Sequence, residues 1–224
     1  MTIQLWHCQN SRSFRVLWAL EEIGADYDLH MLCFPPRVNN KAYLEDNPLG
    51  TVPFLRDGET EMTESCAMLE YLGARYGAGS GCARSPEDAD FGAYLNWLHH
   101  GEATLTFPQT VVLRYARFEP DARKLPQAVE DYREWFLARL RKTEATLSDG
   151  RAFLLPSGFS MADISVAYAA QLAITIGMRE QMPEQVMRWF TGLTERPAFI
   201  RTREIEAKGH IAAGYPERQP VVLP

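Results

Sequence analysis

The chain has 224 residues, of which 46% are apolar and 23% are charged, and its formal net charge is −6. This length suffices for one large domain or two small ones, and the acidic balance disfavours binding to the phosphate backbone of nucleic acids. No apolar run approaches the roughly 20 residues of a membrane-spanning helix, and the first ten residues lack the basic and apolar regions of a signal peptide, so we expect a cytoplasmic protein without nucleic-acid or membrane partners.

The cysteines and histidines show no metal-binding pattern. Cys8, Cys33, Cys66 and Cys82 are far apart and form no C-x-x-C pair. In a reducing cytosol we expect reduced thiols that mostly pack as small apolar side chains. The five histidines form no H-x-x-x-H motif or Cys/His cluster, which indicates that the protein holds no structural or catalytic metal.

The first part of the chain alternates between strand and helix patterns. Residues 3–6 are a short apolar run that predicts a strand. From Ser13 the segment SFRVLWALEEIG places apolar residues at helical spacing, and Gly24 is a suitable stop. Residues 27–33 alternate strictly between apolar and polar positions, which indicates a second strand.

A hairpin and another helix follow. Residues 52–56 form an apolar run, Asp57-Gly58 predicts the turn after it, and we expect a helix over residues 65–76 with Ser65 as its N-cap. The order of strand, helix, strand, hairpin and helix is that of an α/β thioredoxin-like domain, which we place at residues 1–78.

A change of pattern marks the second part of the chain. The Gly- and Ser-rich stretch GAGSGCARSP predicts a linker over residues 79–85. Beyond it the periodicity is helical, so we expect an all-α C-terminal helical domain over residues 86–224 with an irregular C-terminal tail. Within this domain Ser160 and Asp163 have the spacing of a capping box, so we interpret Asp163 as structural.

Pro53 lies inside the apolar run VPFL, where a strand is expected. Proline has no N–H to donate to a sheet ladder, so it is rare inside strands. One interpretation is an edge strand that begins near Phe54. The other is a functional cis-proline, because cis bonds are almost confined to X-Pro.

Five segments carry a resemblance to a known family. In chain order they are NSRSFRVLWALEE, NPLGTVPFL, TESCAMLEYL, WLHHGEATL and GFSMADISVA. With a small α/β domain followed by helices, they resemble the cytosolic glutathione S-transferases over nearly the whole chain, from Leu5 to about Lys208. The first and fourth segments are most similar to a bacterial and fungal group of this family.

The resemblance implies a glutathione site in the first domain. In the family the proline is cis and exposes the backbone of the preceding residue, so the Val52 backbone before Pro53 is expected to pair with the glutathione cysteine. Glu64 and Ser65 are expected to hold the γ-glutamyl end. The Ser65 hydroxyl and N–H suit its carboxylate, and the Glu64 side chain suits its ammonium group.

The glycine end of glutathione has a weaker match. Thr51 stands where relatives often have a lysine or glutamine that contacts the glycyl carboxylate. We therefore expect Thr51 to hold that end more weakly, or Arg37 or Lys41 to hold it instead.

The resemblance implies that the catalytic residue stands four or five positions before the arginine that starts the first helix, here Arg15. Ser11 lies four before, and its hydroxyl is predicted to stabilise the glutathione thiolate, a task for which no buried base is required. Asn10 lies five residues before Arg15. It is the alternative catalytic residue, and it is also expected to contact glutathione. Ser13 is a third alternative unless it only caps the helix. Cys8 forms a glutaredoxin-like Cys8-x-x-Ser11 pattern, but we place it at the end of a strand.

A stripe in the second domain is the expected pocket for the second substrate. The residues that recur at helical spacing are Thr104, Phe107, Val111, Tyr115 and Phe118. The predicted pocket comprises Thr104, Phe107, Val111, Tyr115 and the nearby Arg114. A plain core stripe is the alternative interpretation. Pro108 is expected to bend this helix.

The resemblance as a whole implies a homodimeric detoxification enzyme. It would use glutathione as a cosubstrate, without a metal, and conjugate the thiolate to a small, largely hydrophobic electrophile. The alternatives are a glutathione-dependent isomerase, an ether-cleaving enzyme, a peroxidase, or a non-catalytic regulator of the same fold.

Overall fold

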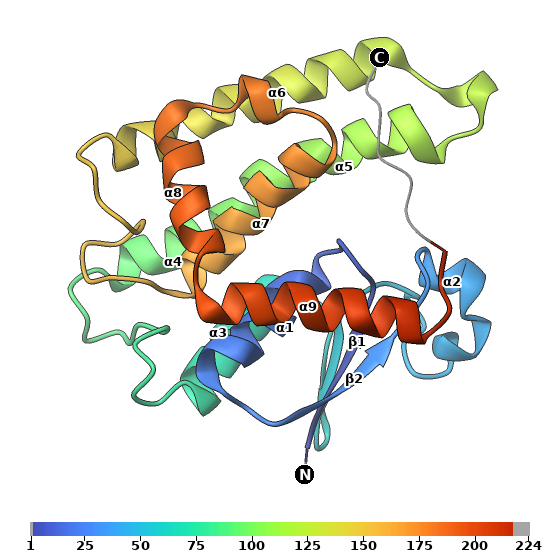
Figure 1. Cartoon of the computed structure of the whole chain (residues 1–224), viewed down its shortest axis with the longest axis horizontal. Coiled ribbons are helices and arrows are strands. Elements are labelled where there is room, and N and C mark those ends of the chain that lie inside the picture. Colours follow the sequence, from blue (N-terminus) through green and yellow to red (C-terminus); the bar gives the residue numbers. More distant parts are fainter. Residues whose placement is uncertain (1, 217–224) are drawn as a thin grey trace. The chain divides into compact units, whose positions relative to one another are not determined.

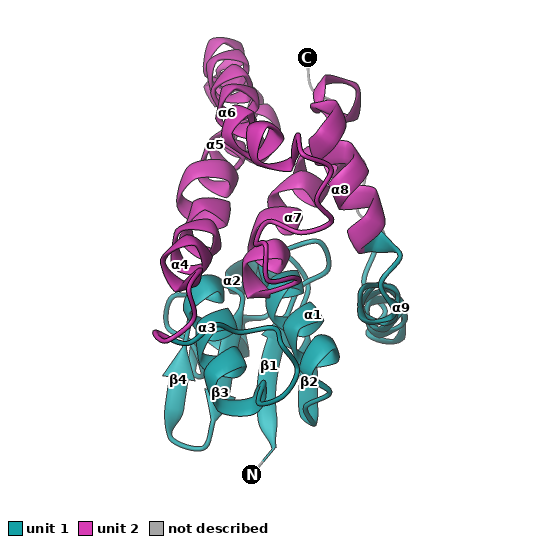
Figure 2. Ribbon diagram, turned by 90° about the vertical axis from the view of Figure 1, so that its left-hand side faces the viewer, with its two compact units in different colours: residues 1–85, 194–217 teal, residues 86–193, 218–224 magenta. Residues whose placement is uncertain are grey.

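The computed structural model describes residues 2–216, which form two compact units. The first unit contains the residues up to 85 and those from 194 on, and the second contains residues 86–193 (Figure 2, teal and magenta). The elements of both are labelled in Figure 1.

The first unit holds a four-stranded mixed sheet with its helices. Its elements are β1 (Ile3–His7), α1 (Ser13–Ile23), β2 (Tyr27–Met31), α2 (Pro36–Asn39), a 3₁₀ turn (Lys41–Leu44), β3 (Phe54–Asp57), β4 (Thr60–Met62), α3 (Ser65–Tyr76) and α9 (Pro197–Ala212). The strand order is β2-β1-β3-β4, with β1 parallel to β2 and antiparallel to β3, and β3 antiparallel to β4. The predicted thioredoxin-like α/β architecture is confirmed.

Local sequence signals set several element ends. Helix α1 ends at Gly24, whose φ of 66° is the left-handed conformation that glycine adopts without steric cost. The β3–β4 turn lies one residue later than predicted, because Asp57 pairs with Thr60 and leaves Gly58 in the first turn position. Helix α3 has the predicted bounds, but its N-cap is Glu64, and Ser65 is already its first helical residue.

The two faces of the sheet carry different side chains. In the register of the strands Leu5 lies between Leu29 and Leu55, and Trp6 lies between His30 and Phe54. Paired residues share a face and successive residues alternate. The Trp6 face forms an aromatic cluster with Phe54 and Tyr43, while His7 lies on the same face as Leu5 and is fully buried.

Helix α9 clusters with the first unit and not with residues 86–193. The Phe199 ring packs edge-on against Phe14 of α1, with ring centroids 5.5 Å apart. The Arg196 guanidinium donates to both carboxylate oxygens of Glu22, at 2.7 and 2.8 Å. The periodicity of α9 predicts a helix but carries no information about which partner it packs on. Past residue 216 the predicted tail lies outside the described residues.

The second unit is helical, as predicted. Its elements are α4 (Phe91–His99), a π-helical segment (His100–Thr106), α5 (Phe107–Leu113), a second π-helical segment (Arg114–Phe118), a 3₁₀ turn (Asp121–Arg123), α6 (Pro126–Leu147), α7 (Met161–Thr175), a 3₁₀ turn (Arg179–Gln181) and α8 (Glu184–Thr194). None of the described helices is both long enough and apolar enough to cross a bilayer.

A π-helical register stands before Pro108, where a bend was expected. A proline has no N–H for the carbonyl four residues back, here that of Thr104. The Phe107 N–H bonds instead to the Glu102 carbonyl, five residues back. The hydrogen-bond register thus widens by one residue just before the position where Pro108 cannot donate.

The described cysteines form no disulfide. Cys8, Cys66 and Cys82 are buried, and Cys33 is half-buried. Burial raises the pKa of the Cys82 thiol, although the Ser80 hydrogen bond acts in the opposite direction. Packing as small apolar side chains is what the sequence predicted for most of these thiols.

The capping box at the start of α7 is present, and its acid does more than cap the helix. Asp163 accepts the Ser160 N–H at 2.9 Å, the Leu154 N–H at 2.9 Å and the Trp189 Nε1–H at 3.2 Å. Complete burial raises the pKa of this carboxyl to about 6, although these hydrogen bonds act in the opposite direction. One side chain thus connects a loop and two helices of the second unit.

We predict that Asp163→Ala destabilises the protein strongly. It leaves three buried donors without their acceptor, and each unsatisfied donor costs about 1–3 kcal/mol, so the free energy of unfolding should fall by about 3 kcal/mol or more. Urea denaturation measures this. Asp121→Ala, which removes an exposed acid of the same unit, should change stability by less than about 0.5 kcal/mol. Equal effects of the two substitutions would contradict the structural role.

Candidate functional site

Three predicted segments meet at one end of the sheet in the first unit. Trp6 pairs with Phe54 in the antiparallel β1–β3 ladder, so continuation of the register places Cys8 opposite Val52. Leu55 pairs with Met62 of β4, so Glu64 follows at the same end. The end of β1, the residues before β3 and the start of α3 are therefore neighbours.

A tight turn leads from β1 into α1. The Ser11 N–H donates to the Cys8 carbonyl at 3.2 Å, which closes a four-residue turn. Its third residue, Asn10, has a φ of 55°, a conformation for which glycine and asparagine are favoured in turns. The Asn10 N–H donates to Glu206 Oε1 at 2.6 Å, and its side-chain oxygen accepts from Arg203 at 2.9 Å. Helix α9 thus fixes this turn.

The Ser11 hydroxyl, the predicted catalytic group, lies at the surface end of a hydrogen-bonded cluster. Its Oγ is 2.8 Å from the Cys8 carbonyl oxygen and 2.7 Å from Ser13 Oγ. Ser13 Oγ lies 2.7 Å from His7 Nδ1. Ser13 is therefore not merely a helix cap: the N-cap of α1 is Arg12, and the Ser13 hydroxyl points toward the sheet. Cys8 follows β1 directly and is fully buried.

The loop before β3 is held by Asn47. Its side-chain oxygen accepts the Leu49 N–H at 3.1 Å, and its amide donates to the Thr51 carbonyl at 2.9 Å. The Tyr43 hydroxyl donates to the same carbonyl at 2.6 Å, and burial raises the Tyr43 pKa to about 12. Gly50 is required here, because its φ is 59° and an added Cβ would lie 2.6 Å from Arg37 Cβ.

This loop leads into the Val52–Pro53 peptide bond, which is cis. Strand β3 begins after it, at Phe54. Within the described part of the chain, the Val52 main-chain N–H and C=O have no hydrogen-bond partner. The backbone at this point can therefore pair with an added extended segment.

The start of α3 combines a helix N-terminus with a buried cation. Ser65 is its first residue, and the fully buried Arg15 of α1 donates to Ser65 Oγ at 3.1 Å. Because Arg15 occupies an acceptor position on this oxygen, the Ser65 O–H can turn toward a ligand. The helix N-terminus favours a negatively charged one. Glu64 beside it is exposed.

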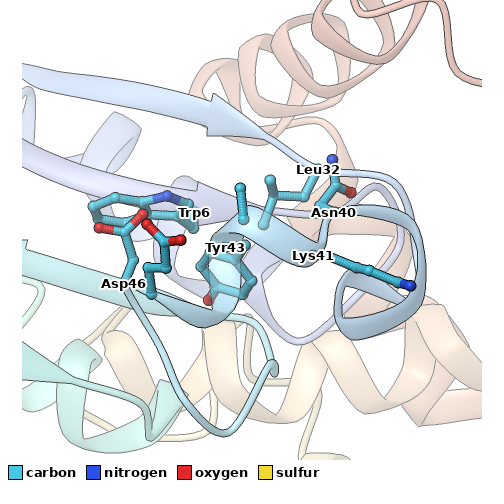
Figure 3. Close-up of a pocket in the computed structure, with 8 residues that line it drawn as sticks. Trp6, Leu32, Asn40, Lys41, Tyr43 and Asp46 are labelled. Carbon is cyan, nitrogen blue, oxygen red and sulfur yellow. The ribbon is translucent and has the colours of Figure 1, made fainter.

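A surface pocket of about 480 Å³ lies on the aromatic face of the sheet (Figure 3). Trp6, Tyr43 and Lys41 are among its lining residues, and Lys41 is the one lining residue that was considered for glutathione binding, as an alternative at the glycyl end. In Figure 3 the Lys41 side chain points away from Trp6. Arg37 is exposed, as is Lys41.

The five residues predicted for a second-substrate pocket lie on the α5 helix and the two π-helical segments beside it. Phe107 is 51% exposed, Arg114 is exposed, and the other three, Thr104, Val111 and Tyr115, are half-buried. They do not form a buried core stripe, which removes that alternative. Arg114 pairs with Glu119 at 2.8 Å. Their role as a pocket stays a prediction.

Comparison with known proteins finds similarity to glutathione S-transferases. A family model described as glutathione S-transferase, N-terminal domain, matches residues 5–81. Glutathione S-transferase 3 of Schizosaccharomyces pombe is 37% identical over 107 residues, which are 46% of this chain and 42% of that protein. Glutathione S-transferase GstB of Escherichia coli is 29% identical over 88% of this chain and 95% of its own. Residues 5–81 therefore match the N-terminal domain of the glutathione S-transferases, and the chain as a whole is similar to these proteins.

A solved structure shows the same similarity. The glutathione transferase URE2P6 of Phanerochaete chrysosporium, in complex with oxidized glutathione, has a TM-score of 0.80 and 25% identity over 92% of this chain and 97% of its own. Within this glutathione S-transferase fold, sequence reasoning missed His7 and Glu206 and used Arg15 only as a spacing marker. The residues around a single histidine or arginine in an apolar stretch do not indicate which distant side chain it will contact in the folded protein.

Proposed function

We propose that the protein is a glutathione transferase that binds glutathione at the end of the sheet in its first unit and conjugates the thiolate to an apolar electrophile. The observation that carries this proposal is the meeting of three features at that end. They are the Val52 backbone without a partner, the Ser65 hydroxyl oriented by Arg15, and the Ser11 hydroxyl in its tight turn.

These features fit the three chemical parts of glutathione that matter most for binding and reaction. The cysteinyl backbone pairs with Val52 as an extra strand would. The γ-glutamyl carboxylate faces the start of α3 and the Ser65 hydroxyl, and its ammonium group faces the exposed Glu64. Thr51 is exposed next to Val52 and borders the glycyl end, where Arg37 or Lys41 supplies a positive charge.

Ser11 provides the contact to the sulfur. A free thiol with a pKa of about 8.5 is only about 3% ionised at neutral pH, and lowering the pKa by about two units requires about 2.7 kcal/mol of preference for the thiolate. A hydrogen bond to a charged acceptor contributes about 1.5–3 kcal/mol, and a helix N-terminus about 0.3–1 kcal/mol. Ser11 beside the start of α1 therefore suffices.

The complete burial of Cys8 argues against a thiol-transferring reductase, because a nucleophilic cysteine must be accessible. Conjugation, isomerisation, ether cleavage and peroxide reduction share the same thiolate. A screen of purified protein with glutathione against aryl halides, epoxides, isothiocyanates and peroxides separates these reactions. Absence of activity in the whole screen would favour a non-catalytic regulator.

Glu64→Ala should weaken glutathione binding. The substitution removes a charge-assisted contact of about 1.5 kcal/mol to the ammonium group, which corresponds to about tenfold in affinity. Titration calorimetry with glutathione measures this. Glu70→Ala, which removes another exposed acid of the same helix, should leave the affinity unchanged. If the two variants bind equally well, Glu64 has no part in the site.

Ser11→Ala should slow conjugation and leave binding nearly intact. Loss of the hydrogen bond should raise the pKa of the bound thiol by about one to two units and lower the rate at neutral pH about tenfold or more. Much of the loss should return near pH 9, where solvent base ionises the thiol. Rates with an aryl halide across this pH range provide the measurement. A large loss in Asn10→Ala with a near-normal Ser11→Ala would assign the role to Asn10.

The homodimer implied by the family stays a prediction. Light scattering at micromolar protein should give twice the chain mass of 25.5 kDa. A mass of one chain under those conditions would contradict it.

A further inference from the structure

Four buried polar side chains form a line from the predicted catalytic hydroxyl into the first unit. Ser11 Oγ lies 2.7 Å from Ser13 Oγ, and Ser13 Oγ lies 2.7 Å from His7 Nδ1. The other ring nitrogen, Nε2, lies 3.2 Å from Glu206 Oε1. Ser11 is 8% exposed, and the other three side chains are fully buried. The line thus begins near solvent at Ser11 and ends at a buried carboxylate.

The inner end of the line is anionic. Burial by itself raises the pKa of the Glu206 carboxyl, but the nearby His7 ring, Arg203 and the Asn10 N–H together hold this pKa below its ordinary value. Arg203 donates to Oε2 at 2.8 Å, and the Asn10 N–H donates to Oε1 at 2.6 Å. A carboxylate beside Nε2 favours the proton on that nitrogen. In neutral His7 the other nitrogen, Nδ1, is then an acceptor.

The protonation state of His7 sets the direction of both hydroxyls. With neutral His7, Ser13 donates to Nδ1, and its oxygen is available to accept the Ser11 proton. The other acceptor within reach of Ser11 is the Cys8 carbonyl. With protonated His7, Nδ1–H donates to Ser13, Ser13 donates to Ser11, and the Ser11 O–H can turn outward.

We propose that His7 takes up the proton of the glutathione thiol through Ser11 and Ser13, an inference that rests on the proposed function. The S–H bond breaks and its proton passes to Ser11 Oγ. The Ser11 proton passes to Ser13 Oγ, and the Ser13 proton passes to His7 Nδ1, where a new N–H bond forms. The sulfur keeps the electron pair as thiolate. Both hydroxyls are neutral after the transfer, and the direction of their hydrogen bonds is reversed. The Ser11 O–H therefore donates to the thiolate.

The charged groups close to His7 are Glu206, on the Nε2 side of the ring, and Arg203, which pairs with the same carboxylate. Cys8 follows His7 in the chain and is also buried. After conjugation the proton returns along the same line to solvent. Ser11 is the catalytic residue, while His7, Ser13 and Glu206 are positioning residues that act through it.

The direct test is the ¹⁵N shift of the His7 ring in the full-length protein. With glutathione bound at neutral pH, the ring should be protonated. With S-methylglutathione, which has no thiol proton, it should stay neutral. Protonation in both complexes, or in neither, overturns the inference. Failure of glutathione to bind in calorimetry overturns the proposed function as well, whereas binding with a neutral ring overturns this inference alone.

Variants extend the test to the line itself. The ultraviolet absorbance of the bound thiolate, followed against pH, gives the thiol pKa in each complex. Ser13→Ala and His7→Asn should both raise it by about one unit or more and remove the thiolate signal at neutral pH. His30→Asn changes another histidine of the same sheet, outside the line, and should leave the titration unchanged. An unchanged titration in folded Ser13→Ala would overturn the inference.

Discussion

The first unit depends on one buried carboxylate from the far end of the chain. Glu206 accepts the Asn10 N–H from 196 residues away and pairs with Arg203 and His7 around it. An isolated carboxylate in this position would be costly to bury, because it loses its hydration. With three partners it instead fixes the turn after β1, and with it the direction from which the Ser11 hydroxyl is presented.

The parts of the fold that sequence predicts well are those with local causes. Gly24 ends α1 because only a residue tolerant of positive φ fits there, and the bounds of α3 follow from its own apolar spacing. The capping box from Ser160 to Asp163 spans only four residues, so its spacing alone identifies it. The same locality let the order of the elements along the chain and the thioredoxin-like class be inferred before any tertiary contact was known.

The candidate site was predicted as a set of residues but not as a network. Spacing before Arg15 indicated Ser11, yet gave no sign that Arg15 itself bonds to Ser65, which lies 50 residues away. His7 lies one residue beyond the strand predicted at residues 3–6, and its neighbour Glu206 in α9 cannot be inferred from local periodicity. Burial and long-range pairing, which require the folded chain, convert these side chains from packing residues into parts of one polar network.

The division of the chain has a consequence for its synthesis. The first unit is built from residues up to 85 and from 194 on, so the second unit is an insertion between its two parts. During translation, residues 86–193 emerge complete while the sheet still lacks α9. The turn that carries Ser11 therefore has no carboxylate to hold it until the ribosome has made nearly the whole chain. A nascent chain arrested before α9 emerges would expose the faces of Phe14 and Trp18 that Phe199 later covers.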